Sequence, residues 1–344
     1  MIPQVPKIPQ IPKIPQIPLE EFLVDCLYDA RESSLGSVPL TPGAPGYREA
    51  RHRFLAAGLA AIQADRAGAG WVQVNVAPGT RLVPDLYARL AEIAADTLDS
   101  GAATNFFFMH KPPGMRVRFQ APGPHDRNAL YLLLARRIAA HPEIFGISQR
   151  GVYEPEGYLF GGPDALPWVH SLFTADSLAW LQYHADRPAA LTDWRYSLML
   201  LRELIEGLGI LGWEHRGVWE TLQHEAGRDL NEEEDGSSRT GGLSKAVAGI
   251  QRYWRLDRDV LTAHLPVTLR ASVDAHRAAI RQAGRTWRTD FFDTGAAEVT
   301  GPRRAAAYCV IFHWNRARFS AALQKLLTQA LVSEGVTRSH PVGR

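Results

Sequence analysis

YEPEGYLFGGPDALPWVHSLFTADS, residues 153–177, joins a first half of the chain that reads as strands and helices to a second half that reads as helices. The Gly-Gly pair within it indicates a tight turn, because glycine enters left-handed backbone conformations without strain. Asp176 or Ser177 is suited to cap the amphipathic helix predicted over residues 176–185. We therefore expect His170, Asp176 and Ser177 to be scaffold residues, with catalysis as the alternative.

Before this stretch, residues 106–119 read FFFMHKPPGMRVRF, which predicts two strands joined by a turn at Lys-Pro-Pro-Gly. The strands predicted in the first half span residues 71–76, 104–110, 115–119 and about 151–154. The helices predicted there span residues 19–30, 47–64, 83–98 and 127–140. The helices predicted in the second half span residues 176–185, 193–211, 217–225, 243–264, 267–283 and 302–332. We expect an α+β fold in which a strand-containing N-terminal half packs with a mostly helical C-terminal half.

Two arginines stand in the second strand of this hairpin. The two-residue period of a strand places Arg116 and Arg118 on one face, while Val117 and Phe119 point to the other. Two neighbouring guanidinium groups repel each other unless an anion or a carboxylate lies between them. The pair therefore either lines a ligand site or forms ion pairs with Asp or Glu, and the sequence leaves both readings open.

A chain of 344 residues, of which 46% are apolar, can bury one large core or two linked ones. We expect a Pro-rich N-terminal segment at 1–18, a single catalytic domain at 19–334 with a mobile loop near 228–242, and a C-terminal tail at 335–344. Proline recurs at every third position of the N-terminal segment, which is the repeat of polyproline II. Such a strip either docks on a partner or on its own domain, or forms a semi-rigid, poorly ordered tail.

Charge and motif content exclude several classes of function. The balance of 38 basic and 36 acidic residues argues against nucleic-acid binding. No apolar run approaches the length of a membrane span, and the N-terminus does not read as a signal peptide, so we expect a cytoplasmic protein. Cys26 and Cys309 lie in apolar contexts and are predicted to be buried thiols. Without a P-loop, a Rossmann glycine pattern or an H-E-x-x-H motif, we expect neither a cofactor nor a metal.

The order of these motifs carries a resemblance to a known family. The YEPE…FGG…HSLFTADS block follows the R-x-R strand and precedes Glu214 with Val218-Trp219 and then the FHWNR of residues 312–316. This set resembles the thiopeptide-type relatives of the C-terminal elimination domain of lanthipeptide dehydratases, over roughly residues 70–330. The resemblance implies the fold of that elimination domain.

Three positions depart from the members of that family that eliminate glutamate. Pro155 and Leu159 stand where those enzymes carry arginine, and Ile311 stands where they carry a histidine base. Each missing arginine removes a charge-assisted hydrogen bond of about 1.5–3 kcal/mol to a glutamyl ester. The chain is therefore more similar to the stand-alone pyridine synthases of thiopeptide biosynthesis.

That similarity implies a formal aza-cycloaddition between two dehydroalanines of a ribosomal peptide, with loss of water and of the leader peptide and closure of a macrocycle. The implied partner is a dehydrated, thiazole-containing precursor peptide with its leader, and other enzymes of the pathway are further candidates. Three alternatives stay open. They are a split dehydratase domain that eliminates glutamate from glutamylated Ser or Thr, an enzyme that handles aminoacyl-tRNA, and a non-catalytic scaffold that binds the precursor.

The helix that would carry the histidine base suggests catalytic candidates. Tyr308 and Asn315 share a face with Ile311, whereas His313 points elsewhere. A neutral donor on that face can stabilise charge on a carbonyl oxygen, so we nominate Tyr308, Asn315 and Ser272 as catalytic residues. The alternatives are a tyrosine hydroxyl that satisfies a buried contact and a serine that bonds its own helix backbone.

A flat, thiazole-rich peptide needs a broad aromatic pocket. The predicted substrate-binding residues are Arg116, Arg118, Phe106, Phe108, His110, Phe173 and Trp287, with Phe107 and Trp168 as further aromatic candidates. For an acidic leader, the helical stripe of Arg277, Arg281 and Arg285 is a candidate binding surface. Such a stripe is equally typical of a solvated helix face.

Overall fold

The computed structural model describes residues 18–34, 45–77, 84–228, 240–297 and 300–334. The predicted C-terminal tail, nearly all of the Pro-rich segment and most of the predicted loop near 228–242 lie outside these residues. The chain divides into two compact units, Met1–Arg66 and Ala67–Arg344. The predicted single domain over 19–334 stays a prediction.

Two helices form the described part of the first unit. They are α1 (Leu19–Ser34) and α2 (Pro45–Ala69), and α2 continues to the start of the second unit. Arg51 is buried and donates from Nε to Oδ2 of Asp29 at 2.7 Å. The hydroxyl of Tyr47 donates to Asp25 at 2.9 Å, so charged and polar bonds join the two helices.

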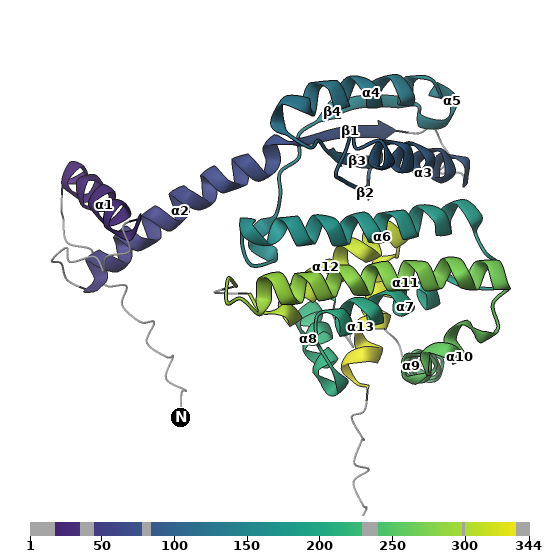
Figure 1. The fold of residues 1–344 in the computed structure, drawn as a ribbon. Helices are drawn as coiled ribbons and strands as arrows, with labels where there is room; N and C mark the ends of the chain where they lie inside the picture. Colours follow the sequence, from purple (N-terminus) through teal and green to yellow (C-terminus); the bar gives the residue numbers. More distant parts are fainter. Residues whose placement is uncertain (1–17, 35–44, 78–83, 229–239, 298–299, 335–344) are drawn as a thin grey trace, which may run out of the picture. The chain divides into compact units, whose positions relative to one another are not determined.

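The described part of the second unit contains a four-stranded antiparallel sheet (Figure 1). Its strands are β1 (Trp71–Ala77), β2 (Asn105–Lys111), β3 (Gly114–Gln120) and β4 (Ile147–Gly151), in the order β2-β3-β1-β4. The first three strands confirm the prediction. The strand predicted near 151–154 is wrong, because the fourth strand lies at Ile147–Gly151, where polar edge residues give no alternating apolar pattern.

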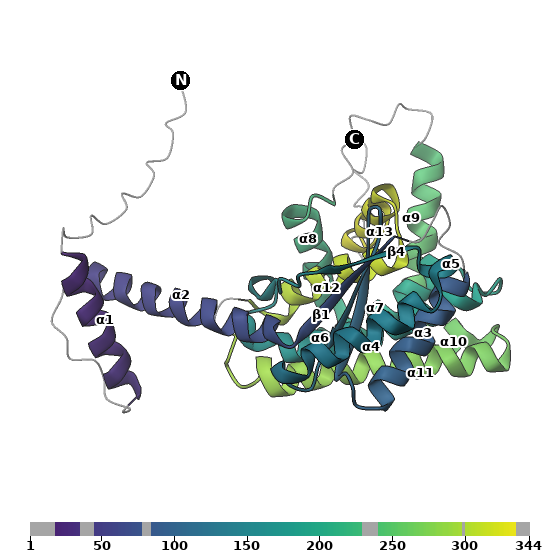
Figure 2. The ribbon, with the colours of Figure 1, turned by 90° about the horizontal axis from the view of Figure 1, so that it is seen from above.

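One face of this sheet is apolar and covered by helices. Arg150 of β4 lies opposite Val74 and stacks on Tyr131 of α4 (Arg127–Ala139), so the valine face is the face toward α4. His110, which shares the Phe106 and Phe108 side of β2, contacts a tyrosine of α3 (Pro84–Asp99). Figure 2 shows both helices on one side of the strands, and the short α5 (Pro142–Phe145) follows α4.

The opposite face of the sheet is polar. It carries Gln73 and Asn75 of β1, Arg116 and Arg118 of β3, and Gln149 of β4, which lie opposite one another in register. Val117 and Phe119 are buried on the other face. The predicted orientation of the two arginines is therefore confirmed.

Helices make up most of the remaining described residues of the unit. They are α6 (Leu166–Asp186), α7 (Asp193–Gly207), α8 (Arg216–Glu225), α9 (Thr240–Arg255), α10 (Arg258–Ala263), α11 (Val267–Trp287), α12 (Pro302–Ala317) and α13 (Ala321–Val332). α6 runs along the outer edge of β2 (Figure 1), where the N–H of Phe106 donates to Oγ1 of Thr174 at 3.0 Å. The N–H of Phe108 donates to Ser177 Oγ at 3.3 Å in the same way. The predicted α+β fold is confirmed.

Several helix boundaries differ from the prediction. α6 begins at Leu166, so Asp176 and Ser177 lie in its interior and the capping role predicted for them is wrong. The helix predicted over 302–332 is two helices, because Arg318 adopts left-handed backbone with φ 61°. Ser320 then caps α13 by accepting a hydrogen bond from the N–H of Leu323. The helix predicted over 243–264 is likewise divided, between α9 and α10.

Candidate functional site

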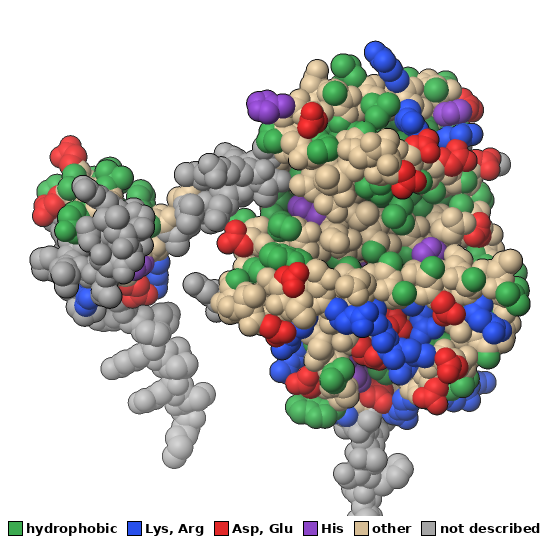
Figure 3. Space-filling view, in the orientation of Figure 1, with side chains coloured by type: hydrophobic (Ala, Val, Ile, Leu, Met, Phe, Trp, Pro, Cys, Tyr) green, Lys and Arg blue, Asp and Glu red, His purple; other side chains and the backbone are tan. Residues whose placement is uncertain are grey.

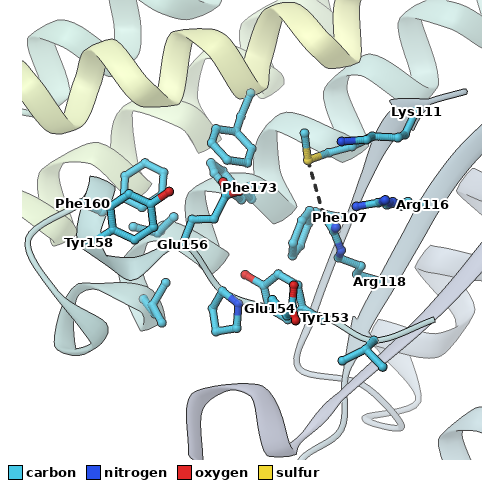
Figure 4. A pocket seen from close by; sticks show the side chains of 16 residues that line it. Phe107, Lys111, Arg116, Arg118, Tyr153, Glu154, Glu156, Tyr158, Phe160 and Phe173 are labelled. Atoms are coloured by element: carbon cyan, nitrogen blue, oxygen red, sulfur yellow. Dashed lines mark hydrogen bonds between the residues drawn. The ribbon is translucent and has the colours of Figure 1, made fainter. Parts of the chain in front are cut away.

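A cavity of about 340 Å³ lies against the polar face of the sheet (Figure 4). β2 and β3 form one wall, the loop after β4 forms a second, and α6 with α12 closes the third. The lining residues are Phe107, Met109, Lys111, Arg116, Arg118, Val152, Tyr153, Glu154, Pro155, Glu156, Tyr158, Phe160, Leu166, Val169, Phe173 and Phe312. We call this cavity the sheet-face pocket.

Arg118 is a buried cation at the base of the sheet-face pocket, 7% exposed. Its Nε–H donates to Oε1 of Gln73 at 2.7 Å, and its guanidinium lies 5.0 Å from the ring centre of Phe107 and 4.9 Å from that of Tyr153. Burial lowers the pKa of Arg118 to about 10, so the group remains charged at neutral pH. No carboxylate of the described residues pairs with it.

Two further cations stand beside Arg118 along the strands (Figure 4). Lys111 and Arg116 both line the pocket, and neither has an ion pair or a side-chain hydrogen bond within the described residues. The alternative in which Arg116 and Arg118 form ion pairs with Asp or Glu is therefore not found in this part of the chain. Their donors are available to a carbonyl oxygen or an anion.

The facing loop brings two carboxylates to the pocket. Glu154 and Glu156 are exposed and, within the described residues, lack ion-pair partners. The loop turns back at Gly161 and Gly162, whose φ angles of 106° and 109° confirm the predicted tight turn. Because such angles strain any side-chain-bearing residue, the two glycines fix where the loop meets α6.

A tyrosine and a histidine hold this loop in place. The hydroxyl of Tyr153 lies 2.8 Å from Nε2 of His170, which belongs to α6. Burial lowers the pKa of His170 to about 3, so its ring is neutral and can accept a hydrogen bond from the tyrosine hydroxyl. Burial likewise raises the pKa of Tyr153. This bond keeps the Tyr153 ring beside the guanidinium of Arg118.

The third wall is aromatic. The ring of Phe173 lies 5.4 Å from that of Phe107 and 4.9 Å from that of Phe312. Behind them Arg316 is fully buried, with its guanidinium 4.5 Å from the ring centre of Phe173. Such a wall suits flat, unsaturated ligand groups.

Arg316 is anchored by a buried carboxylate. Its Nη1 donates to Oδ2 of Asp176 at 2.8 Å, and Oδ1 of Asp176 lies 2.7 Å from Nδ1 of His313. Burial alone would raise the pKa of Asp176, but His313 and Arg316 hold it below its ordinary value. The scaffold role predicted for Asp176 thus has a physical basis in the pairing of α6 with α12.

The structure places only part of the predicted substrate-binding set together. Arg116, Arg118 and Phe173 line the sheet-face pocket, as does Phe107. Phe106 and Phe108 are fully buried on the other side of β2, and His110 lies on their side. Trp287 is fully buried behind the pocket against Phe160, and Trp168 packs on Phe291; neither is a lining residue.

None of the three catalytic candidates lines the sheet-face pocket. The hydroxyl of Tyr308 donates to Glu225 at 2.8 Å. Asn315 is bound by both ends of its amide to the backbone of His110, at 2.8 and 2.9 Å. Ser272 lies half-buried on α11. Their catalytic roles stay predictions.

The predicted leader-binding arginines are largely neutralised by acidic residues. Arg277 donates to Oε1 of Glu203 at 2.9 Å, and Arg281 pairs with Oε2 of the same carboxylate. Arg285 is exposed and bonds to Gln282 at 3.0 Å. Figure 3 shows basic and acidic side chains interspersed over this part of the surface. Leader binding by these arginines stays a prediction.

Sequence reasoning missed several lining residues, among them Lys111, Glu154, Glu156 and Phe312. The two-residue period of a strand could have identified Lys111. Phe107, Met109 and Lys111 share one side of β2, and the register places the first two opposite Arg118 and Arg116. That register depends on the length of the turn, which the sequence did not settle.

Two kinds of feature are absent from the described residues. No group of three or more His, Cys, Asp or Glu side chains in the described ranges is arranged to hold a metal ion. No helix among them is both long and apolar enough to cross a membrane.

Comparison with known proteins gives the family. The chain is similar to the tRNA-dependent lantibiotic dehydratase MibB from Microbispora sp. 107891, with 17% identity and a TM-score of 0.52, over 77% of this chain and 28% of MibB. It also matches TsrL, with 15% identity and a TM-score of 0.39, over 77% of this chain and 94% of TsrL. No curated protein sequence gives a significant match. The family described as lantibiotic biosynthesis dehydratase C-term matches residues 71–333, and the chain belongs to this family.

Proposed function

We propose that this chain forms the central pyridine ring of a thiazolyl peptide by a formal cycloaddition of two dehydroalanines. The observation that supports this most is the composition of the sheet-face pocket. It combines Lys111, Arg116 and Arg118, none paired with a carboxylate among the described residues, with an aromatic wall. No described lining residue is a histidine, which agrees with Ile311 at the position of the eliminases' base.

The proposed reaction balances without an oxidant. An amide beside the first dehydroalanine becomes an iminol, and the resulting 2-azadiene forms two C–C bonds with the alkene of the second dehydroalanine. The iminol hydroxyl then leaves as water. The C–N bond to the leader breaks next, and the leader departs as a carboxamide. Each elimination also removes one proton from a ring methylene, which leaves an aromatic pyridine.

The pocket supplies groups suited to each step. Arg116 and Lys111 can donate hydrogen bonds to the amide oxygen as it becomes an iminol and later as it leaves with a proton. Glu154 or Glu156 can accept the protons released from the amide nitrogen and the ring methylenes. The aromatic wall holds the two alkenes in register, and well-oriented intramolecular partners reach effective molarities of about 10⁵–10⁸ M.

A glutamate-eliminating dehydratase domain is the second candidate, because the same three cations would also bind a glutamyl carboxylate. Pro155 and Leu159 count against it, since both lie in the loop that would carry the additional arginines. A non-catalytic scaffold that binds the precursor peptide is the third candidate.

One substrate comparison separates the three candidates. The purified chain is incubated with a bis-dehydroalanine thiazolyl peptide that carries its leader and, separately, with a glutamylated serine peptide. Mass spectrometry that detects loss of water plus leader from the first peptide alone supports ring formation. Loss of glutamate from the second would favour elimination, and binding of either peptide without mass change would favour the scaffold.

A further inference from the structure

A second cavity adjoins the sheet-face pocket. Its volume is about 310 Å³, and it shares Lys111 and Arg116 with that pocket. Its other lining residues come from the end of β1, the turn between β2 and β3, and β4; they are Asn75, Val76, Ala77, Pro112, Pro113, Gly114, Met115, Ile147 and Gln149. The two cavities therefore meet at Lys111 and Arg116.

A row of side chains leads from the first cavity into the second. In register across the sheet, Arg116 of β3 lies between Met109 of β2 and Asn75 of β1. Gln149 of β4 lies on the far side of Asn75. Directly opposed residues of an antiparallel sheet share a face, so these four side chains form one line across the polar face. The line ends at β4, where Gln149 is exposed.

A chain of hydrogen bonds orients the amide in this row. The Nε–H of Arg118 donates to Oε1 of Gln73 at 2.7 Å, and Nε2 of Gln73 donates to Oδ1 of Asn75 at 2.9 Å. Gly151 leaves room for the side-chain amide of Gln73, since a Cβ at position 151 would lie 2.4 Å from Nε2 of Gln73. Nδ2 of Asn75 and the amide of Gln149 have no partner within the described residues.

These free groups match the chemistry of a peptide backbone. Side-chain amides donate to carbonyls and accept from N–H groups, and they carry no charge. Among the described lining residues of the second cavity none is a carboxylate, and its cations stand only at the junction. Two strand spacings of about 4.8 Å separate Arg116 from Gln149, a distance that about three extended residues span.

We propose that the second cavity binds an extended, uncharged flank of the precursor peptide, which leaves the reacting centre at Arg116 and runs across β1 to Gln149. This inference rests on the proposed function, because it takes the reacting centre to lie in the sheet-face pocket. It assigns Asn75 and Gln149 to substrate binding and predicts that about three residues beside the reacting centre contribute to affinity.

The test measures binding rather than turnover. Fluorescence anisotropy compares three labelled bis-dehydroalanine thiazolyl peptides: a short form, a form with about three added uncharged residues on its N-terminal side, and one with the same addition on its C-terminal side. We expect the full chain to bind one of the extended forms at least about tenfold more tightly than the short form. Which form binds more tightly identifies the flank.

Variants of β4 locate the effect. Gln149→Trp fills the second cavity and should abolish the preference for the extended form, and Gln149→Ala should weaken it. Ser148→Trp is the matched control, because Ser148 is exposed on the same strand but points to the opposite face.

Wild-type binding of all three peptides with equal affinity would overturn the proposal. So would a Gln149→Trp variant that keeps the preference. If the preference is present but no ring forms, the proposed function fails, while binding of the peptide flank in the second cavity is supported.

Discussion

Arg118 donates its Nε–H to the neutral amide of Gln73 at 2.7 Å, and no carboxylate of the described residues forms an ion pair with it. A buried cation held by an amide leaves a positive potential in the cavity that a carboxylate partner would cancel. This pairing keeps the sheet-face pocket attractive to oxygen atoms of a ligand.

Changing this amide to a carboxylate tests the role of the free charge. Gln73→Glu preserves the side-chain length but would pair with Arg118, so we expect turnover to fall by about 10²-fold while the fold is retained. Steady-state kinetics and a thermal melt measure the two effects. Unchanged turnover would show that the charge of Arg118 does not act on the substrate.

Arg116 should matter for turnover and hardly for stability. Arg116 forms no ion pair or side-chain hydrogen bond within the described residues, so Arg116→Met removes no such contact. We therefore expect the melting temperature to stay nearly constant while kcat/KM falls at least about tenfold. Arg136→Met is the matched control, since Arg136 is exposed on α4. A large drop in melting temperature with normal turnover would show that Arg116 is structural.

The buried pair of Asp176 and Arg316 should dominate stability. Asp176→Asn leaves Arg316 without its counter-charge, and breaking a buried pair in this way costs about 3–5 kcal/mol of unfolding free energy. Urea unfolding measures the loss. The double variant Asp176→Leu/Arg316→Met should recover much of it, and a single variant of wild-type stability would contradict the assignment.

Mild acid should destabilise the fold through buried histidines. Burial lowers the pKa of His110 and His184 to about 4 and that of His170 to about 3, whereas an unfolded histidine has a pKa of about 6.5. The unfolded state therefore binds more protons than the folded state below about pH 6.5, so the free energy of unfolding falls as pH decreases from about 6.5 toward 4. Each histidine contributes at most about 1.4 kcal/mol per pH unit to this loss. Urea unfolding at pH 7 and pH 5 checks this, and His184→Gln should reduce the difference.

The Tyr308→Phe variant tests whether catalysis takes place in the sheet-face pocket or on the face of α12 that carries Tyr308. Its hydroxyl is bonded to Glu225 and is not among the pocket-lining atoms, so we expect Tyr308→Phe to keep ring formation within a few-fold of wild type. A loss on the order of 10²–10³-fold, the size of an oxyanion contact, would instead support the catalytic role nominated for Tyr308. Single-turnover kinetics by mass spectrometry measures the difference.

Local patterns in the sequence predicted the local features of the structure. The two-residue period gave the shared face of Arg116 and Arg118, and the Gly-Gly pair gave the turn at Gly161. The pocket depends instead on contacts between distant segments. Phe312 reaches the pocket from α12, and only the packing of that helix on Phe173 shows that it does.

The basic stripe on α11 shows the same limit for charge. Helical spacing places Arg277 and Arg281 together, but Glu203 of α7, far away in the sequence, pairs with both. Periodicity describes which residues share a face, and it carries no information about what another helix brings to that face.

The most direct test of ring formation in the sheet-face pocket follows the two alkene carbons. A leader-bearing peptide is prepared with ¹³C at the methylene carbon of both dehydroalanines and incubated with the wild-type chain and with Arg116→Met. Cycloaddition bonds these two carbons to each other, so we predict a one-bond ¹³C–¹³C coupling between aromatic ring carbons in the wild-type product, and its formation at a strongly reduced rate with the variant. Consumption of the peptide without that coupling, or its formation at an equal rate by both proteins, would contradict this account.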